Sequence, residues 1–275
     1  MLHLGAHMST GKGFDKAAAD AQSIGADAMQ VFTRNPRGGK ARVLKEKELE
    51  KLAEYRNQGL VVVCHAPYTI NLASSSDDVR DFGKRTIAED LQRMQQLGAS
   101  GLVVHSGAHT GAGKETGLAR LIASLEVLLP QAAPGTRILL ETMSGSGSEL
   151  GSTLEEMQQV FAYFDHSPAL GVCLDTCHLF AAGYDIRDWP AFKAQFETFL
   201  PWSVVGCIHM NDSKTAFSSH KDRHEKLGQG SIGWDAFKAI VQIEAETPLP
   251  IIMETPNVLA GWAEEIAVLR NTLKA

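Results

Sequence analysis

The alternation of short apolar runs with longer helical patterns is the feature that most restricts how this chain can fold. Between the runs, apolar residues recur three and four positions apart, as in residues 14–25, 79–98 and 118–131, which is the spacing of amphipathic helices. Eight apolar runs fit buried strands: residues 2–7, 28–32, 60–66, 101–106, 137–142, 170–176, 204–211 and 250–255. Repeated strand–helix units predict a parallel sheet, and eight units favour a closed (β/α)8 TIM barrel over an open sheet.

The residues between these runs support a single domain. Gly98 is placed to end one helix, and the segment 152–156 (STLEE) has the signature of a capped helix start. The Gly/Ser-rich segment 145–152 is too short to separate two domains, and the composition does not change along the chain. A length of 275 residues suits one such barrel. We therefore expect residues 1–275 to form one α/β barrel domain.

Composition limits the classes of function. No apolar run approaches the roughly 20 residues that cross a bilayer, and the first residues lack a signal-peptide pattern, so we expect no membrane association and a cytoplasmic location. The four cysteines lie in or beside strand-like runs, which predicts reduced, buried thiols. The net charge of −6, taken alone, argues against a nucleic-acid partner, because phosphate binding normally draws on a basic surface.

Histidine and carboxylate side chains gather where six consecutive strands are expected to end. In a barrel of this kind the active site lies at the carboxyl ends of the strands and on the loops that follow them. Nine metal-ligand candidates occupy these positions: His65, His105, Glu141, Asp175, His178, His209, Asp222, His224 and Glu254. A single histidine or glutamate at a strand end is usually a hydrogen-bonded or solvated side chain, but so many together indicate a metal site.

The donor set restricts the metal and the chemistry. Five imidazoles and four carboxylates favour zinc, manganese or iron over calcium and magnesium, which prefer oxygen ligands. Because one ion takes four to six ligands, nine ligands imply two or three ions, and such clusters split phosphodiesters. Three divalent ions carry six positive charges, and four carboxylates with one hydroxide carry five negative ones, which would leave a local charge of about +1. An acidic chain could therefore still bind a phosphate at this site.

Several motifs in this order resemble the endonuclease IV family, the zinc-dependent endonucleases that act at apurinic/apyrimidinic sites in base excision repair (AP endonuclease family 2, deoxyribonuclease IV type). The resemblance spans residues 4–266, and its most specific parts are HAPYTINLA (65–73), GVCLDTCH (171–178), HMNDSK (209–214) and DRHEKLGQG (222–230). It implies a xylose-isomerase-like TIM barrel that acts on duplex DNA containing abasic sites, as a monomer without an organic cofactor.

The resemblance assigns three zinc ions to the nine candidates, and manganese is an alternative occupant because imidazole–carboxylate ligand sets also accept it. It implies that His65, His105 and Glu141 hold the first ion. Glu141 would bridge to a second ion, held also by Asp175, His209 and Glu254. His178, Asp222 and His224 would hold the third.

The resemblance also implies a reaction. A hydroxide between the first two ions, positioned by Glu141, would attack the phosphate 5′ to the abasic sugar and leave a 3′-hydroxyl and a 5′-deoxyribose phosphate. Removal of 3′ blocking groups is expected as well. All three ions would stabilise the transition state.

Contacts with DNA are expected from the loops after the second and third strands. The candidate contact residues are Arg34, Asn35, Arg37, Tyr68 and Thr69. Arg37 and Tyr68 match family side chains that enter the duplex. The chain departs from the family pattern in three places: Thr69 replaces an apolar wedge, Gly38-Gly39 replaces bulkier residues, and Ser218 stands where the family generally has glycine.

Two other functions remain open at this point. A sugar isomerase or epimerase of the xylose-isomerase-like barrels would use one or two ions and would not need the Asp222–His224 pair. A non-catalytic barrel that binds damaged DNA would bind without cleaving. His7, at the end of the first strand, is interpreted either as a partner of a metal ligand or as a hydrogen-bonded core histidine.

Overall fold

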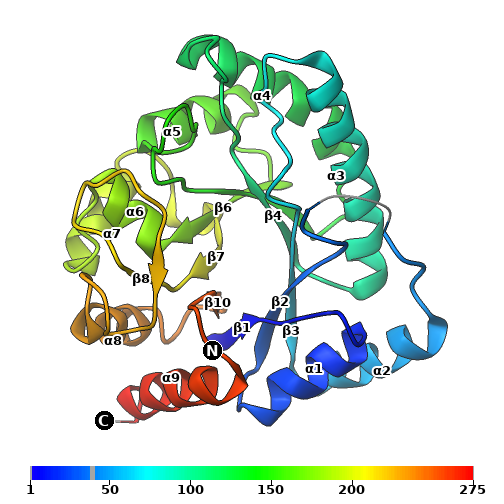
Figure 1. Cartoon of the computed structure of the whole chain (residues 1–275), viewed down its shortest axis with the longest axis vertical. Coiled ribbons are helices and arrows are strands. Elements are labelled where there is room, and N and C mark those ends of the chain that lie inside the picture. The colour runs from blue at the N-terminus through cyan, green and yellow to red at the C-terminus, as the bar shows by residue number, and fades with distance from the viewer. Residues whose placement is uncertain (1, 38–40, 275) are drawn as a thin grey trace.

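The structure is a computed structural model that describes residues 2–37 and 41–274. The Gly38-Gly39 departure from the family pattern lies outside the described residues. Within them, eight parallel strands close into a barrel in the order β1-β10-β7-β6-β5-β4-β3-β2, and the helices surround the strands (Figure 1). The predicted (β/α)8 barrel is therefore confirmed.

All eight predicted strands are present, and each boundary lies within two residues of the predicted one. The barrel strands are β1 (His3–His7), β2 (Ala28–Phe32), β3 (Val61–His65), β4 (Gly101–His105), β5 (Arg137–Glu141), β6 (Leu170–Asp175), β7 (Val205–His209) and β10 (Pro250–Met253). A two-stranded antiparallel hairpin, β8 (Asp212–Ser213) with β9 (His224–Glu225), was not predicted and follows β7.

The helices pack outside the strands. They are α1 (Phe14–Ser23), α2 (Glu46–Asn57), α3 (Asp77–Leu97), α4 (Lys114–Leu128), α5 (Leu154–Tyr163), α6 (Thr176–Ala182), α7 (Trp189–Glu197), α8 (Trp234–Ile243) and α9 (Leu259–Thr272), with short 3₁₀ turns η1 (Leu129–Gln131) and η2 (Trp202–Val204). Both predicted helix signals are confirmed. Gly98 ends α3 in the left-handed conformation with φ 64°, and the Thr153 side chain accepts a hydrogen bond from the Glu156 amide at the start of α5.

Two apolar layers hold the barrel together. The strand–helix layer is the larger, and it includes Leu4, Leu102, Ile138 and Phe237. Inside the barrel, a smaller cluster is formed by Ala28, Val63, Val103, Leu139, Cys173, Cys207 and Ile252. This inner cluster fills the barrel below the carboxyl ends of the strands and forms the floor of the candidate site. No helix in the described part of the chain is both long and apolar enough to span a membrane.

One irregularity in the sheet affects the site directly. Val172 of β6 pairs with Val205 of β7, but the next residue, Cys173, pairs with Cys207, which leaves Gly206 without a partner. A bulge of this kind adds one residue to one strand. Because side chains alternate between the two faces of a strand, the extra residue brings both Cys207 and His209 to the barrel interior.

Candidate metal centre

Glu141 is the centre of the predicted ligand set. Its carboxylate ends β5 and is 1% exposed. Oε2 lies 3.2 Å from His65 Nε2 and 3.4 Å from His105 Nε2, and Oε1 lies 3.3 Å from His209 Nδ1. Oε1 is also 3.4 Å from His178 Nδ1. One carboxylate therefore faces four imidazoles that come from four different parts of the chain.

Strand register explains why these side chains meet. His105 pairs directly with Glu141, and Asp175 pairs directly with His209. Partners on adjacent strands point to the same face of a sheet. Around His209, Nδ1 lies 3.4 Å from Glu254 Oε2 and 3.8 Å from Asp175 Oδ2. These contacts bring the predicted second ligand group together.

The third predicted group forms where β6 turns into α6. Asp175 is the last residue of β6 and also caps α6, accepting a hydrogen bond of 2.8 Å from the His178 amide through Oδ1. The loop that leads into β9 brings Asp222 to this end, with Oδ2 3.3 Å from His178 Nε2 and Oδ1 3.3 Å from His224 Nε2. The structure thus brings all nine predicted ligand side chains to one end of the barrel.

The charges at this site depend on one another. Burial opposes ionisation of Glu141, yet His209 and His105 lower the pKa of this carboxyl well below its usual range. Burial likewise lowers the pKa of His209, but Glu254 and Glu141 raise it well above the ordinary value. A buried carboxylate is costly unless a cation compensates it. The cluster therefore needs positive charge, which metal ions would provide.

The spacing of the donor atoms and two unpaired ring nitrogens also fit bound metal ions. Three sets of predicted ligand side chains, His65–His105–Glu141, His65–His209–Glu254 and His178–Asp222–His224, each have ligand atoms within 4.8 Å of one another. Among the described residues, the buried Nε2 atoms of His178 and His224 have no hydrogen-bond partner. Buried polar atoms are normally satisfied, so two bare ring nitrogens beside Asp222 are what a metal-binding group would present.

Hydrogen bonds behind the ligands orient them. His65 Nδ1 lies 2.6 Å from the Ala66 carbonyl, and His178 Nδ1 lies 2.8 Å from the Thr142 carbonyl. Asn211 donates from Nδ2 to Asp175 Oδ2 at 2.7 Å, and its Oδ1 accepts from the Glu254 amide at 2.9 Å. Such partners fix the ring or carboxylate orientation of a metal ligand.

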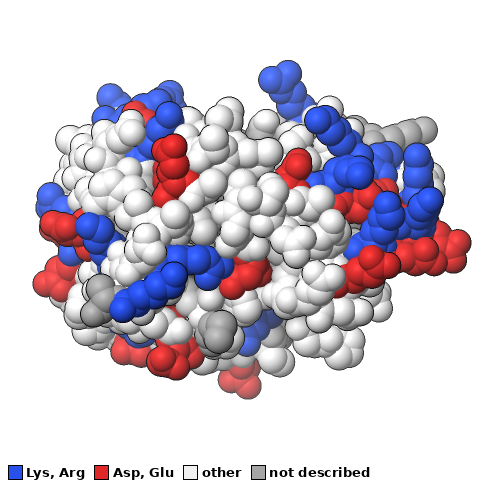
Figure 2. Space-filling view, turned by 90° about the horizontal axis from the view of Figure 1, so that it is seen from below, with Lys and Arg blue, Asp and Glu red and all other residues white. Residues whose placement is uncertain are grey.

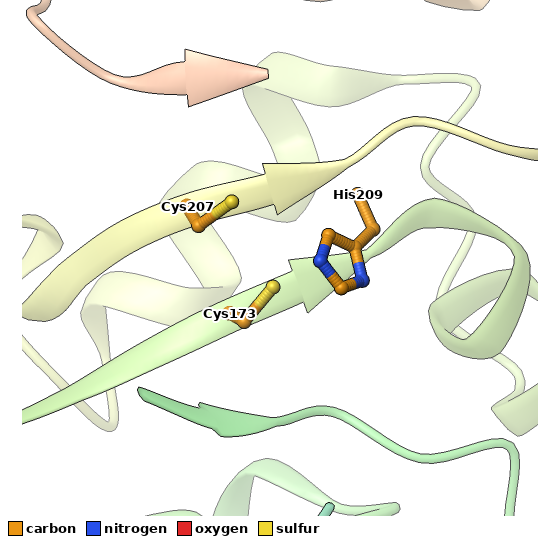
Figure 3. A group of neighbouring side chains, drawn as sticks. All are labelled: Cys173, Cys207 and His209. Carbon is orange, nitrogen blue, oxygen red and sulfur yellow. The ribbon is translucent and has the colours of Figure 1, made fainter. Parts of the chain in front are cut away.

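A further group of possible donors lies below this layer. Figure 3 shows Cys207 and His209 on β7 and Cys173 on β6, with the two thiols set back along the strands from the imidazole. All four cysteines are buried and free. Burial raises the pKa of the Cys173 thiol well above its usual range; burial opposes ionisation of Cys207 as well, but its hydrogen bonds with Cys173 and His209 lower its pKa to about 6. Both side chains pack among the apolar residues of the inner cluster. We therefore interpret this pair as part of the barrel core.

The predicted DNA-contact residues lie in two loops. Tyr68, which follows β3, is 49% exposed, and its ring stands edge-on to Phe32 with centroids 5.7 Å apart. Thr69 is exposed beside it. In the loop after β2, Arg37 is exposed. The backbone amide of Arg37 donates a hydrogen bond of 3.0 Å to the side-chain oxygen of Asn35. Tyr68 and Arg37 are therefore available to a ligand, and their contact with DNA stays a prediction.

Arg34 is placed differently from the other predicted contact residues. It is 8% exposed, and its Nε donates to Asp90 Oδ1 on α3 at 2.8 Å. Its Nη2 also lies 3.0 Å from Glu89 Oε2. Arg93, one turn further along α3, donates twice to the Thr33 carbonyl, at 3.1 and 2.8 Å. In this arrangement Arg34 attaches the loop after β2 to α3, and a phosphate would have to compete with Asp90.

We expect Asp90→Ala to destabilise the protein by roughly 3–5 kcal/mol, because it leaves the Arg34 guanidinium buried without its main partner. The exposed pair Asp185–Arg187, with contacts of 2.7 Å, provides a matched control. Asp185→Ala should cost less than about 1 kcal/mol. Urea unfolding of both variants measures the difference. Equal losses in the two variants would show that the Asp90 contact does not anchor the loop.

Ser218, the predicted departure in the loop after β7, has a physical consequence. Its φ is 57°, in the left-handed region that glycine enters without steric cost and other residues enter with strain. Its amide donates to the Phe180 carbonyl at 3.1 Å. The loop therefore keeps a glycine-type conformation with serine in that position.

The surface in Figure 2 shows Lys and Arg mixed with Asp and Glu. This face has no uniformly positive area that would attract a phosphate backbone by itself. Beside the ligand cluster, a cavity of about 950 Å³ opens between the loops after β1, β2 and β10, lined in part by His7, Phe32, Asn35 and Trp262.

Sequence reasoning missed several residues that support the site, and Gln30 is the clearest. It is fully buried in β2 and bonds to His209 and Glu254. A glutamine inside the apolar run AMQVF was the available signal, since buried polar groups need partners. His7, left open between two interpretations, lies 2.8 Å from Glu254 Oε1 through Nδ1 and is therefore a partner of a predicted ligand.

Known proteins resemble this chain over its whole length. The family described as a xylose isomerase-like TIM barrel matches residues 18–272. A probable endonuclease 4 from Heliobacterium modesticaldum is 42% identical over 278 residues, which cover 99% of this chain and all of the relative. The crystal structure of endonuclease IV from Thermus thermophilus is similar with a TM-score of 0.86 and 28% identity, over 99% of both chains.

A likeness to sugar epimerases is confined to the fold. A D-tagatose 3-epimerase-like protein is similar with a TM-score of 0.76 and 20% identity, over 99% of this chain and 97% of the other. At this level of identity, a shared barrel fold does not indicate that the two proteins catalyse the same reaction.

Proposed function

Because this chain belongs to the endonuclease IV family of xylose isomerase-like TIM barrels, we propose that it cleaves duplex DNA on the 5′ side of abasic sites at a centre of three zinc ions. Family membership makes it an endonuclease of DNA repair, a metal-dependent hydrolase of phosphodiesters that acts on DNA. The proposal adds the substrate preference, the number of ions and the residues that hold them.

The position of Glu141 is the observation that supports this proposal most. Its two carboxylate oxygens face His65 and His105 on one side and His209 on the other, as a bridge between two ions requires. Asp222, His178 and His224 form a separate group beside it. A third group is the feature that an isomerase with one or two ions would not need.

The residues of the chain have distinct parts in the proposed reaction. Zinc ions bound here would lower the pKa of a coordinated water and stabilise negative charge on the phosphate. Glu141 would hold the first two ions at the spacing that this chemistry needs. The buried floor formed by Val103, Leu139 and Ile252 excludes water from below the site, which strengthens the electrostatic interactions above it.

We propose that the exposed loops recognise the damage. Tyr68 would stack on bases next to the abasic site, and Arg37 would enter the duplex from the other loop. Thr69 is shorter and more polar than an apolar wedge, so we expect Tyr68 to contribute the larger share of the distortion. The attachment of the Arg37 loop to Asp90 and Arg93 would restrict its motion before binding and so lower the entropic cost of binding.

The proposal also covers the reaction products, the metal, the oligomeric state and the location of the protein. We infer that the products are a 3′-hydroxyl and a 5′-deoxyribose phosphate and that 3′ blocking groups are removed as well. Manganese is an alternative occupant of one or more sites, because imidazole–carboxylate ligand sets also accept it. We further propose that the chain acts as a single-domain monomer in the cytoplasm.

The test is a duplex oligonucleotide with one tetrahydrofuran abasic analogue, incubated with the zinc-loaded protein and separated on a denaturing gel. This analogue cannot undergo β-elimination, so a single nick on its 5′ side reports hydrolysis. We expect that nick, a product end that a polymerase extends, and no cleavage of an undamaged duplex of the same sequence.

The same experiment separates the alternatives. Binding of the abasic duplex without a nick, by protein that holds three zinc ions, would favour the non-catalytic barrel. Neither binding nor nicking, with about one ion per chain, would favour the sugar isomerase. Either result would overturn the proposed function.

A further inference from the structure

Gln30 joins three side chains at the edge of the proposed metal centre. It lies on β2 and is fully buried. Its Oε1 lies 2.8 Å from His209 Nε2, and its Nε2 lies 2.7 Å from Glu254 Oε1 and 3.0 Å from His7 Nδ1. Two of these partners, His209 and Glu254, belong to the proposed second ligand group. Both polar atoms of the Gln30 amide are taken up by these side-chain contacts.

The chemistry of these partners determines the orientation of the amide. A carboxylate only accepts hydrogen bonds, so the atom of Gln30 that faces Glu254 Oε1 must be the NH₂ group. The carbonyl oxygen then faces His209, and because a carbonyl only accepts, His209 Nε2 must carry the proton. A neutral imidazole has one protonated nitrogen. In the neutral ring that binds a metal ion, His209 Nδ1 is therefore the nitrogen without a proton.

His209 Nδ1 faces the carboxylates of the proposed second ligand group. His209 Nδ1 lies 3.3 Å from Glu141 Oε1, 3.4 Å from Glu254 Oε2 and 3.8 Å from Asp175 Oδ2. These three carboxylates come from three different barrel strands or their ends. An imidazole nitrogen surrounded by three carboxylate oxygens is a set of four donors, as a tetrahedral zinc site requires.

The other imidazoles of the proposed centre present the opposite nitrogen. His65 and His178 bond through Nδ1 to backbone carbonyls, which leaves Nε2 for an ion. His105 and His224 also direct Nε2 toward the carboxylates. His209 differs because its Nε2 is bonded to a side chain, Gln30, from a distant strand of the barrel.

Gln30 also distinguishes the two oxygens of Glu254. Oε1 accepts from Gln30 and lies 2.8 Å from His7 Nδ1, while Oε2 is the oxygen that faces His209 Nδ1. Occupation of Oε1 by these two partners leaves Oε2 for an ion. One amide therefore orients two ligands at once, one by accepting a hydrogen bond and the other by donating one.

We propose that Gln30 is a positioning residue for the second metal ion, which it serves by holding His209 in the tautomer with a bare Nδ1 and Glu254 with Oε2 free. This inference rests on the proposed three-ion centre. Without Gln30, the His209 ring has other partners, because the thiols of Cys173 and Cys207 lie within 4.8 Å of one of its nitrogens (Figure 3). A thiol is a weak donor and would not select the same tautomer.

The first test needs no variant. In zinc-loaded protein with ¹⁵N-labelled histidine, two-bond ¹H–¹⁵N correlation spectra identify which ring nitrogen carries the proton. We expect His209 to carry it on Nε2 with zinc on Nδ1, and His65 and His178 to show the reverse. The His209 signals are assigned by their loss in His209→Gln. A proton on Nδ1 of His209 in the loaded protein would overturn the proposal.

The second test compares Gln30→Met, which keeps the length of the side chain but removes both polar groups, with Val31→Ala, which opens space in the strand–helix layer on the other face of β2. Zinc per chain is measured by mass spectrometry at a series of buffered free-zinc concentrations. We expect one of the three ions to bind roughly 10- to 100-fold more weakly in Gln30→Met, and all three to bind normally in Val31→Ala.

The possible results distinguish failure of the proposed role of Gln30 from failure of the proposed three-ion nuclease centre. Equal zinc affinities in Gln30→Met, Val31→Ala and the unchanged protein would overturn the role of Gln30 and leave the nuclease proposal intact. If the unchanged protein binds fewer than three ions, the three-ion centre is wrong and the inference fails with it.

Discussion

Glu141→Gln is expected to reduce cleavage of abasic DNA by roughly 10³-fold or more. The amide keeps the shape of the side chain but removes the negative charge and one of the two metal-binding oxygens. A metal ion contributes several kcal/mol to the stabilisation of a charged transition state, and about 4 kcal/mol corresponds to a factor of about 10³ in rate. Because Glu141 faces both proposed ions of the first pair, its replacement should also lower the zinc content.

The control for this variant is Glu155→Gln. Glu155 is exposed in the first turn of α5 and lies outside the ligand set, so this variant should retain activity and zinc. Single-turnover cleavage of the tetrahydrofuran duplex and zinc analysis measure both effects. Glu141→Gln protein with normal zinc and normal cleavage would refute the bridging role.

Removal of metal is expected to abolish cleavage and to lower the melting temperature by about 10 °C. Ligands that bind only the native state at about a thousand times their dissociation constant stabilise it by about 4 kcal/mol, and each kcal/mol shifts the melting temperature of a protein of this size by a few degrees. In addition, Glu141, Glu254, Asp175 and Asp222 would lose the cations that compensate their mutual repulsion.

The metal-free protein should remain folded. Its interior cluster and the strand–helix layer include no proposed ligand, so the far-ultraviolet circular dichroism should keep its barrel signature after dialysis against dipicolinate. Re-addition of zinc should restore both the melting temperature and the nick. Full activity after complete metal removal would exclude the proposed chemistry.

The barrel itself was predictable from sequence because its signals are local. Strand positions followed from apolar runs, and the ends of helices followed from residues such as Gly98 and Thr153, whose conformations depend on their neighbours in the chain. The ligand candidates were predictable because barrel topology places all strand ends on one side, whatever the loops do.

The interactions that orient the ligands were not predictable in this way. Gln30 and His209 are separated by 179 positions, and no local pattern indicates that they meet. The attachment of Arg34 to Asp90 likewise depends on how α3 packs against the loop after β2. Arg34 illustrates the limit, because a loop arginine has the same sequence signal whether it is solvated, bound to a phosphate or buried in an ion pair.

The unpaired Gly206 lets the site tolerate one change of length. Between the pairs Val172–Val205 and Asp175–His209, strand β7 has one residue more than β6. Loss of Gly206 would remove the bulge and give a regular ladder, in which His209 still lies opposite Asp175. The metal centre can therefore survive a one-residue deletion in β7 at this position. Because side chains alternate between the two faces of a strand, the same deletion in a strand without a bulge would turn its ligand away from the barrel interior.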